Sequence, residues 1–355
     1  MVIQYKCPNC GADMAFDSTS GMLHCESCGR KDNVDTFKNK NTSNNTSSNS
    51  TSSSSKNNKY FGEDEATEYK CNNCGAHLIT DKFTSATTCN FCGAGMVLSD
   101  RLNGKLSPEL IIPFKISKEQ GMEAFKKWCK KGLLTPKGFM NADRIKSITG
   151  LYVPFWLYDL NCIGDAEALC TIVRTYEQGD YIYTETKHYE VYRSVDLTYD
   201  YVPVDASEKM NDELMEKLEP FNYSALSDFN MPYLAGFIAE KYSYDDKTLF
   251  PHAKARVTNY VNEYINQTIS GYTTTNFRKR NVSVHPKDAH YVLFPVWMVC
   301  YDYKKSEHTF AMNGQTGKIV GKPPLSKGKI AGWIAGISAS SFIIMRLLTF
   351  ILGGM

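Results

Sequence analysis

The sequence of 355 residues lacks an excess of charge of either sign, because 40 Lys and Arg stand against 38 Asp and Glu and leave a net charge of +2. No global positive field therefore favours binding to a phosphate backbone, and a nucleic-acid site would have to be local. The first ten residues also lack the charged segment followed by an apolar stretch that marks a secretory signal. We expect the N-terminal part to stay in the cytoplasm.

Several catalytic motifs are missing as well. The sequence has no G-x-x-x-x-G-K-[ST] phosphate loop and no G-x-G-x-x-G, which disfavours an ATP-driven helicase. It has no H-E-x-x-H and no G-x-S-x-G, so zinc hydrolases and serine hydrolases lack their local signatures. The histidines are scattered, and His285, His290 and His308 are expected at ordinary surface or core positions. We therefore expect a protein that is not an enzyme.

What the chain does have is cysteine in a repeated pattern. Eight of its twelve cysteines form four C-x-x-C pairs, with 14 residues between the pairs of each half and a glycine after every second cysteine. These eight are Cys7, Cys10, Cys25, Cys28, Cys71, Cys74, Cys89 and Cys92. Two C-x-x-C pairs brought together by a hairpin supply the four tetrahedral ligands of a structural Zn²⁺ site. We predict two zinc ribbons that hold one Zn²⁺ each.

Other interpretations of these cysteines differ in what they require. Iron stays open, because four thiolates also suit that ion. Disulfides would need an oxidising compartment, and a thioredoxin-like role would need a C-x-x-C at the start of a helix in a βαβ unit. Four further cysteines occur singly and are predicted to be buried structural thiols. They are Cys129, Cys162, Cys170 and Cys300.

The two ribbons, residues 1–34 and 69–100, are close to neutral in charge. Binding to DNA without sequence preference needs several Lys or Arg contacts to phosphate, so we favour protein contact or a structural role over nucleic-acid contact. The linker, residues 35–68, includes a run of Asn, Ser and Thr alone at 41–55. Such a run cannot bury enough apolar surface to become ordered, so we predict a flexible tether and a first ribbon that moves independently of the second.

The segment 105–325 has the composition of a globular α+β domain. Apolar residues recur there at three- and four-residue steps in three stretches, which predicts helices. These stretches are 118–131, 208–218 and 248–268. Between the first two, residues 170–204 alternate polar with apolar or aromatic side chains, which predicts an antiparallel meander with several turns. Asn313-Gly314 predicts a type I′ hairpin.

Three apolar segments of this domain carry an internal proline, at Pro113, Pro154 and Pro295. Proline is tolerated at the first residue or on the edge of a strand, so we predict strand starts or edges at these places. Trp156 and Trp297 follow two of the prolines and are predicted to be core anchors.

The last hydrophobic segment, 330–352, has Arg346 as its one charged residue. As a helix it would measure about 34 Å at 1.5 Å per residue, enough to cross a hydrocarbon core of about 30 Å. Arg346 lies six residues from the end and can snorkel toward the headgroups. We predict a single span in the cell membrane, with a buried or interfacial helix as the alternatives.

Flanking residues of this segment predict its orientation. Three lysines precede it, which favours the cytoplasmic side for the globular part. They are Lys322, Lys327 and Lys329. Small residues recur every four positions, at Gly332, Gly336 and Ser340, and leave self-association into a homo-oligomer open.

Extended strings along the chain carry a family resemblance. Among them are "YKCPNCGA", "CNFCGA", "LIIPFK", "GLYVPFWLYD", "YLAGFIAEKY", "FPVWM" and "TFAMNGQTGKIVGKPPLSKGK". By these strings the chain resembles the bacterial, mainly Firmicute, TFIIB-type zinc ribbon-containing membrane proteins, which are often labelled primosomal or replication-restart helicases. The resemblance implies a membrane protein without established catalysis, with PspA-like and SPFH-domain proteins of envelope-stress systems as partners. From that family the zinc ligands alone carry over, onto the eight paired cysteines.

These features together predict a membrane-anchored adaptor: two zinc ribbons, a central antiparallel-sheet α+β domain and one C-terminal transmembrane helix, with protein partners and the lipid bilayer as its contacts. The alternative is a membrane-tethered regulator that binds nucleic acid through its ribbons. An enzyme that acts on lipid or envelope material would need a deep pocket with converging carboxylates or histidines in the α+β domain.

Overall fold

The computed structural model describes residues 2–37, 66–98 except 73, 76, 82–83 and 90–93, 107–139 except 131, 133 and 137–138, 145–303 and 306–352. The predicted α+β fold class is confirmed. The α-helices are α1 (Lys118–Lys130), α2 (Asp212–Leu218), α3 (Asp246–Thr268) and α4 (Lys327–Leu352), and the 3₁₀ turns are η1 (Val34–Phe37), η6 (Tyr223–Ala225) and η7 (Met231–Leu234).

The described strands range from two residues to more than thirty. They are β1 (Val2–Ile3), β2 (Met14–Asp17), β3 (Met22–Cys25), β4 (Lys31–Asp32), β5 (Ala66–Lys70), β6 (His77–Asp81), β7 (Thr84–Thr88), β8 (Gly95–Leu98), β9 (Leu110–Ile111), β10 (Ile145–Gln178), β11 (Tyr181–Asp205), β12 (Ser227–Asp228), β13 (Ile238–Glu240), β14 (Thr274–Tyr303), β15 (Ser306–Asn313) and β16 (Ile319–Val320).

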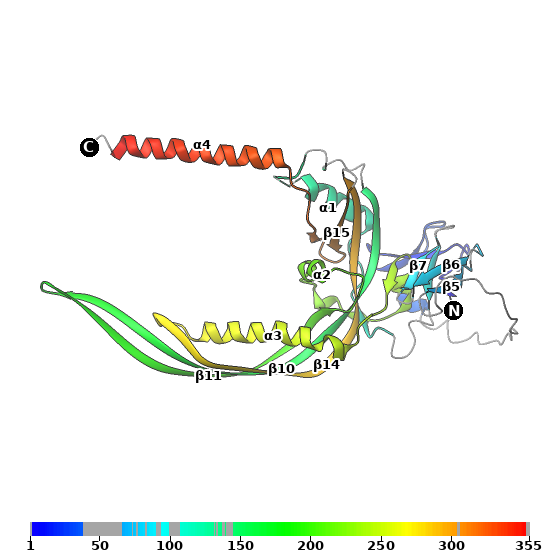
Figure 1. Cartoon of the computed structure of the whole chain (residues 1–355). Helices are drawn as coiled ribbons and strands as arrows, with labels where there is room; N and C mark the ends of the chain where they lie inside the picture. The colour runs from blue at the N-terminus through cyan, green and yellow to red at the C-terminus, as the bar shows by residue number, and fades with distance from the viewer. Residues whose placement is uncertain are drawn as a thin grey trace, which may run out of the picture.

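One large sheet organises the molecule, with strand order β1-β8-β7-β13-β10-β14-β15-β16. β11 also pairs with β10, on the same side as β13 but further along the strand. The central strands of this sheet are so long that they leave the body as a curved arm of β11, β10 and β14 (Figure 1). α3 lies along one face of this arm, and α4 projects from the opposite end of the body to the same side as the arm (Figure 1). The ribbons lie on the other side of the body, near the N-terminus (Figure 1).

The arm corrects the predicted meander. Residues 170–204 contain a single turn, at Gly179 and Asp180, between two strands whose pairing runs from Phe155↔Asp205 to Gln178↔Tyr181. The alternation of apolar and polar side chains does reflect a half-buried sheet, because one face of the sheet packs under α3. The hydrophobic core between α3 and the arm includes Leu160, Cys162, Ala166 and Ala168 of β10, and Val257, Val261 and Ile265 of α3.

Pro154 and Pro295 occupy strand interiors, so the prediction of strand starts or edges is wrong for both. Pro113 lies outside a strand, two residues after β9 ends at Ile111. On one side of β10, β13 pairs up to Tyr152 and β11 begins at Phe155, so Pro154 lies where neither neighbour needs its missing N–H. Pro295 likewise lies between the parallel pairing of β14 with β9, which reaches Leu293, and its pairing with β15, which begins at Val296. Pro154 and Pro295 each mark the exchange of one neighbouring strand for another.

The predicted helices are confirmed with shifts at their ends. α2 begins at Asp212, later than expected, because the Asn211 side chain caps it by accepting from the Leu214 N–H at 3.0 Å. α3 begins at Asp246 with Asp245 as its cap, which accepts from the Thr248 N–H at 2.8 Å. β15 and β16 confirm the hairpin but not its type. Asn313 accepts through Oδ1 from the Gln315 and Thr316 N–H groups, and the positive φ of 75° falls on Gly317.

An aromatic cluster forms the centre of the body. Phe237 stacks on Phe114 with ring centroids 4.3 Å apart and lies 6.0 Å from Trp297. The Trp297 indole donates to the carbonyl of Ile116 at 3.0 Å, so this residue is a core anchor as predicted. Trp156 is half-buried and donates to the carbonyl of Tyr244 at 3.0 Å.

Phe237→Ala should lower the free energy of unfolding by about 3–5 kcal/mol, because it leaves a cavity among several aromatic side chains. Urea unfolding of the detergent-solubilised chain, followed by tryptophan fluorescence, measures this change. Tyr192→Ala is the control, since the Tyr192 side chain is 63% exposed on the arm and should change stability by no more than about 0.5 kcal/mol. Equal effects of the two variants would contradict the assignment of Phe237 to the core.

Candidate metal centre

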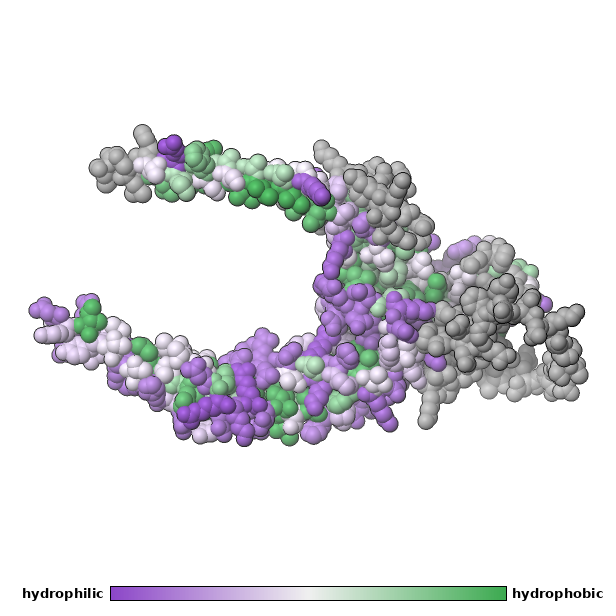
Figure 2. All heavy atoms as spheres, viewed as in Figure 1, coloured by the Kyte–Doolittle hydropathy of each residue, from purple (hydrophilic) through white to green (hydrophobic). Residues whose placement is uncertain are grey.

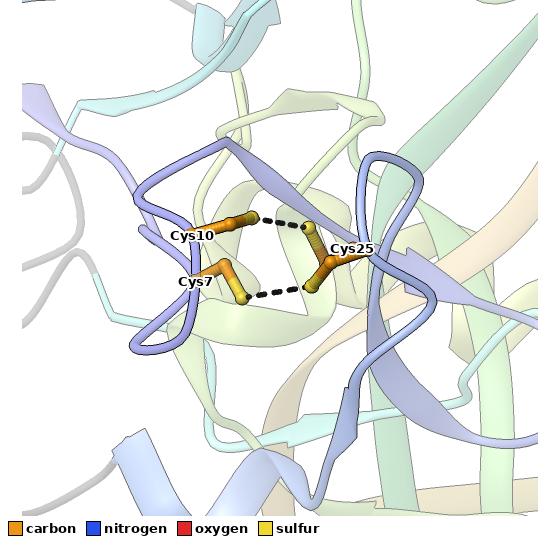
Figure 3. Close-up of side chains that lie close together, drawn as sticks. Cys7, Cys10 and Cys25 are labelled. Atoms are coloured by element: carbon orange, nitrogen blue, oxygen red, sulfur yellow. Dashed lines mark hydrogen bonds between the residues drawn. The ribbon is translucent and has the colours of Figure 1, made fainter.

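The four cysteine sulfurs of the first ribbon cluster around a common centre. The Sγ atoms of Cys7, Cys10, Cys25 and Cys28 all lie within 4.8 Å of one another. The knuckle with Cys7 and Cys10 faces the knuckle with Cys25 across a small gap (Figure 3). The closest contacts are 3.6 Å from Cys7 to Cys28 and 3.5 Å from Cys10 to Cys25.

These separations fit a tetrahedral ion. Four sulfurs at about 2.3 Å from one centre lie about 3.8 Å from each other, close to the distances between the knuckles. Thiolates at this spacing could hold Zn²⁺ or iron, and the geometry is common to both. Such a site, when loaded, would tie the two knuckles together and stabilise the ribbon.

The second ribbon repeats the arrangement with three described ligands. Cys71, Cys74 and Cys89 bring their sulfurs within 4.8 Å of one another, and Cys74 lies 3.7 Å from Cys89. The fourth predicted ligand, Cys92, lies outside the described residues. Among the described ligands, the first cysteine of each knuckle is buried, as at Cys7 and Cys71, and the second is exposed, as at Cys10, Cys28 and Cys74.

Glycines shape the knuckles as the sequence indicates. Gly11, Gly29 and Gly75 have φ near 75°, a conformation that glycine adopts without steric cost. Each donates its N–H to the carbonyl of the first cysteine of its knuckle, at 2.8 to 2.9 Å. The C-x-x-C-G pattern therefore determines local backbone geometry before any ion binds.

The exposed thiols of the first ribbon differ in acidity. The backbone amide of Arg30 lowers the pKa of Cys28 to about 6, against the effect of burial. At Cys10 the amide of Ala12 acts in the same direction, but hydrogen bonds with neighbouring thiols outweigh it and raise the pKa to about 11. One thiolate thus forms readily, and the other protons leave as a metal binds.

Basic side chains of the first ribbon are paired with aspartates. Lys6 lies 2.6 Å from Asp13 and Lys31 lies 3.2 Å from Asp17. Arg30 contacts both carboxylate oxygens of Asp32, at 2.7 and 3.0 Å. Phosphate contacts would have to compete with these carboxylates, which disfavours a nucleic-acid surface here.

The expectation that the first ribbon moves independently is wrong. β1 pairs with β8 through Val2↔Leu98 and Ile3↔Val97, which joins the ribbons through the large sheet. Phe16 of β2 donates its N–H to the carbonyl of Ala235 at 2.9 Å, and its ring lies 5.2 Å from Tyr233. Apolar side chains that a separate ribbon would expose are buried against the body instead.

Structure also reaches into both ends of the predicted linker. Residues 34–37 form η1, whose Val34 and Phe37 are buried, and residues 66–70 form β5. The rest of the linker, residues 38–65, lies outside the described part of the chain. The single cysteines are buried as predicted at Cys129, Cys162 and Cys170, whereas Cys300 is half-buried.

α4 is the one helix in the described part that is long and apolar enough to cross a membrane. Its apolar window covers Lys327–Thr349, and none of it is buried against the body. Arg346 lies 5.6 Å from the Phe342 ring and so has an aromatic contact within the helix. Figure 2 shows α4 as a mainly hydrophobic rod beside a more hydrophilic arm.

The α+β domain has a hollow of about 700 Å³ between α2 and α3. Asp205, Glu219 and His252 are among its lining residues, and Arg256 is held there by both carboxylate oxygens of Glu219. Among the described residues, the side chains of this hollow do not bring three ligand atoms as close together as the cysteines do. The predicted surface or core histidines are also separate, and His290 contacts Glu109 at 2.8 Å on another part of the sheet.

Two cysteine clusters and one apolar C-terminal helix on an α+β body define a protein equipped to bind metal ions and compatible with membrane insertion. The chain is 54% identical over 354 residues to "Uncharacterized protein YdjG" of Bacillus subtilis (strain 168), which covers 100% of this chain and 99% of that protein. The chain belongs to the family of that protein. No family model matches the chain, so the TFIIB-type assignment and the PspA-like and SPFH-domain partners stay predictions. No solved structure matches it either.

Metal analysis by mass spectrometry should find two ions per chain, and Cys28→Ser should reduce this to about one. The reason is that three remaining thiolates bind an ion far more weakly than four. Cys300→Ser is the matched control and should keep two ions. Equal metal content in the Cys28→Ser variant and the natural chain would contradict the site.

Stability should fall as pH rises from 5 to 8.5, and the part due to Asp205 should be lost mainly below pH 7. Burial raises the pKa of Asp205 to about 7, whereas an unfolded aspartate has a pKa of about 3.9. A raised folded-state pKa contributes stability below pH 3.9 that is lost as pH rises through 7. His290 acts in the same direction, because Glu109 and two further carboxylates raise its pKa against the effect of burial.

Urea unfolding of Asp205→Asn across this pH range tests the assignment. The variant should be more stable than the natural chain at pH 8.5, and the difference should shrink toward pH 5. His290→Gln serves as the comparison, since it removes the other titration and leaves Asp205 in place. A pH slope that Asp205→Asn leaves unchanged would show that this carboxyl does not cause it.

Proposed function

We propose that this protein is a membrane-anchored scaffold at the cytoplasmic face that binds protein partners through its zinc-ribbon end. The observation that carries the proposal is the position of the two cysteine clusters, which lie on the side of the body opposite to α4 (Figure 1). A helix held in the bilayer would leave that end of the body free to meet cytoplasmic proteins.

The metal in this proposal is Zn²⁺. A reducing cytoplasm keeps the thiols available, and four-cysteine sites in small ribbons are typical of structural zinc. The ions would stabilise the ribbons rather than react, and the proposal includes no catalytic step. Lys322, Lys327 and Lys329 beside α4 support a cytoplasmic body by the distribution of positive charge around membrane helices.

Protein contact is favoured over nucleic-acid contact by the surface of the first ribbon. Its three basic side chains are each engaged by an aspartate. Protein partners do not require free cations, and PspA-like and SPFH-domain proteins, which the family resemblance points to, are the first to test. Retention of DNA by the solubilised chain at low salt, with loss at high salt, would instead favour a membrane-tethered regulator.

Affinity capture from solubilised membranes tests the scaffold. The chain with Cys7→Ser and Cys71→Ser should lose partners that the natural chain retains, because each change removes a buried ligand of one ribbon. Cys129→Ser and Cys300→Ser together form the control and should retain the partners. Capture that the ribbon variant leaves unchanged would move recognition to the α+β domain, and release of the chain by an alkaline wash would contradict the anchor.

A further inference from the structure

The far end of the arm is a two-stranded hairpin that extends beyond β14 and α3, which cover the rest of the arm. β14 joins the sheet at Thr274, opposite Thr171, so residues 172–187 have no third strand. α3 ends at Thr268, and its core with the sheet reaches Cys170. A two-stranded hairpin is marginally stable in water without a packed face, so contact with another surface would stabilise this end.

Exposed aromatic side chains gather at this end. Tyr176 pairs with Tyr183 and stacks on it with centroids 5.6 Å apart, and Tyr181 lies 6.5 Å from Tyr183. We call Tyr176, Tyr181 and Tyr183 the tyrosine tip; their exposed fractions are 50%, 70% and 45%. By alternation these three lie on one face of the hairpin, whereas Ile182, paired with Glu177, lies on the other. By the alternation along β10, Tyr176 lies on the same face of the sheet as Ala168 and Cys170, the face that α3 covers closer to the body.

That face points to the side where α4 projects (Figure 1). If α4 is in a bilayer, as the proposed function states, the tyrosine tip lies on the membrane side of the body. Tyrosine is enriched at membrane–water interfaces because its ring is apolar and its hydroxyl is polar.

The arm itself cannot enter hydrocarbon. It exposes Asp165, Glu190, Arg278 and Lys279 along its length, and its outer strands have open backbone edges. α4 and the arm project together, so α4 has to turn relative to the arm when it crosses a bilayer. Among the described residues, the base of α4 is bonded to the body by Ser326 N–H to the Leu134 carbonyl and by Lys329 Nζ to the Thr135 carbonyl, both 2.8 Å, and the proposal places the turn at this attachment.

We propose that the arm lies beneath the membrane surface and that the tyrosine tip binds the headgroup region of the leaflet that α4 enters. The inference rests on the proposed membrane anchor. Electrostatic attraction to anionic lipid does not drive the contact, because residues 172–187 carry a net charge of −1. Their charged residues are Arg174, Lys187, Glu177, Asp180 and Glu185. Zwitterionic lipid is therefore sufficient, and anionic lipid adds little.

A fluorescent amino acid encoded in place of Tyr181 in the full-length chain tests this in phosphatidylcholine vesicles. The probe should be quenched several-fold more by a nitroxide at the headgroup than by one at mid-chain, and a fifth of phosphatidylglycerol should change this by less than twofold. The matched control is the same probe at Ser194, an exposed position on the arm closer to the body, which should be quenched weakly by both lipids. Replacing Tyr176 and Tyr183 by serine should reduce quenching at position 181 to the control level.

Each other outcome would overturn the proposal in its own way. Equal quenching at positions 181 and 194, in vesicles that retain the chain after an alkaline wash, would leave the anchor standing and refute the tip contact. Release of the chain in the wash would refute the anchor and the tip contact together. Quenching that falls as the protein-to-lipid ratio rises would show that a second copy of the chain covers the tip instead.

Discussion

Strand β10 must satisfy its backbone hydrogen bonds along 34 residues, and the rest of the molecule is arranged around that requirement. β14 follows it along nearly its whole length, while β13 and then β11 share its other side. The exchange from β13 to β11 occurs at Pro154, where no N–H is present to be left unpaired. One strand thus connects the ribbon side of the body to the end of the arm.

The ribbons depend on this sheet as much as on their own ligands. β7 and β8 of the second ribbon continue the sheet beyond β13, and β1 of the first ribbon is its last strand on that side. Gln4, next to β1, donates to the sulfur of Cys71 at 3.7 Å, so the first ribbon contacts a ligand of the second metal site. A structural change in one cluster would therefore affect the packing of the other cluster and of the aromatic centre of the body. A partner that binds the ribbons would contact a rigid end of the molecule.

Much of this organisation was predictable from local pattern. The C-x-x-C-G knuckles, the amphipathic helices α1 and α3, and the apolar helix α4 all follow from residues close together in the sequence, and the structure confirms their kinds. Cap residues explain the shifts at helix ends, since Asn211 and Asp245 decide where α2 and α3 begin. The type I′ turn was mispredicted because the Asn313 side chain satisfies two backbone donors and moves the positive φ to Gly317.

Local sequence was enough to show which cysteines group together, where the helices lie and that the last helix is mainly apolar, because spacing and periodicity act over a few residues. Tertiary structure decided that the ribbons join the main sheet, that two prolines sit inside central strands and that one long hairpin replaces a meander. These depend on pairing between residues far apart in the chain, such as Val2 with Leu98 and Phe16 with Ala235. Alternation of side chains indicates that a strand has a buried face, but it carries no information about which strand will lie beside it.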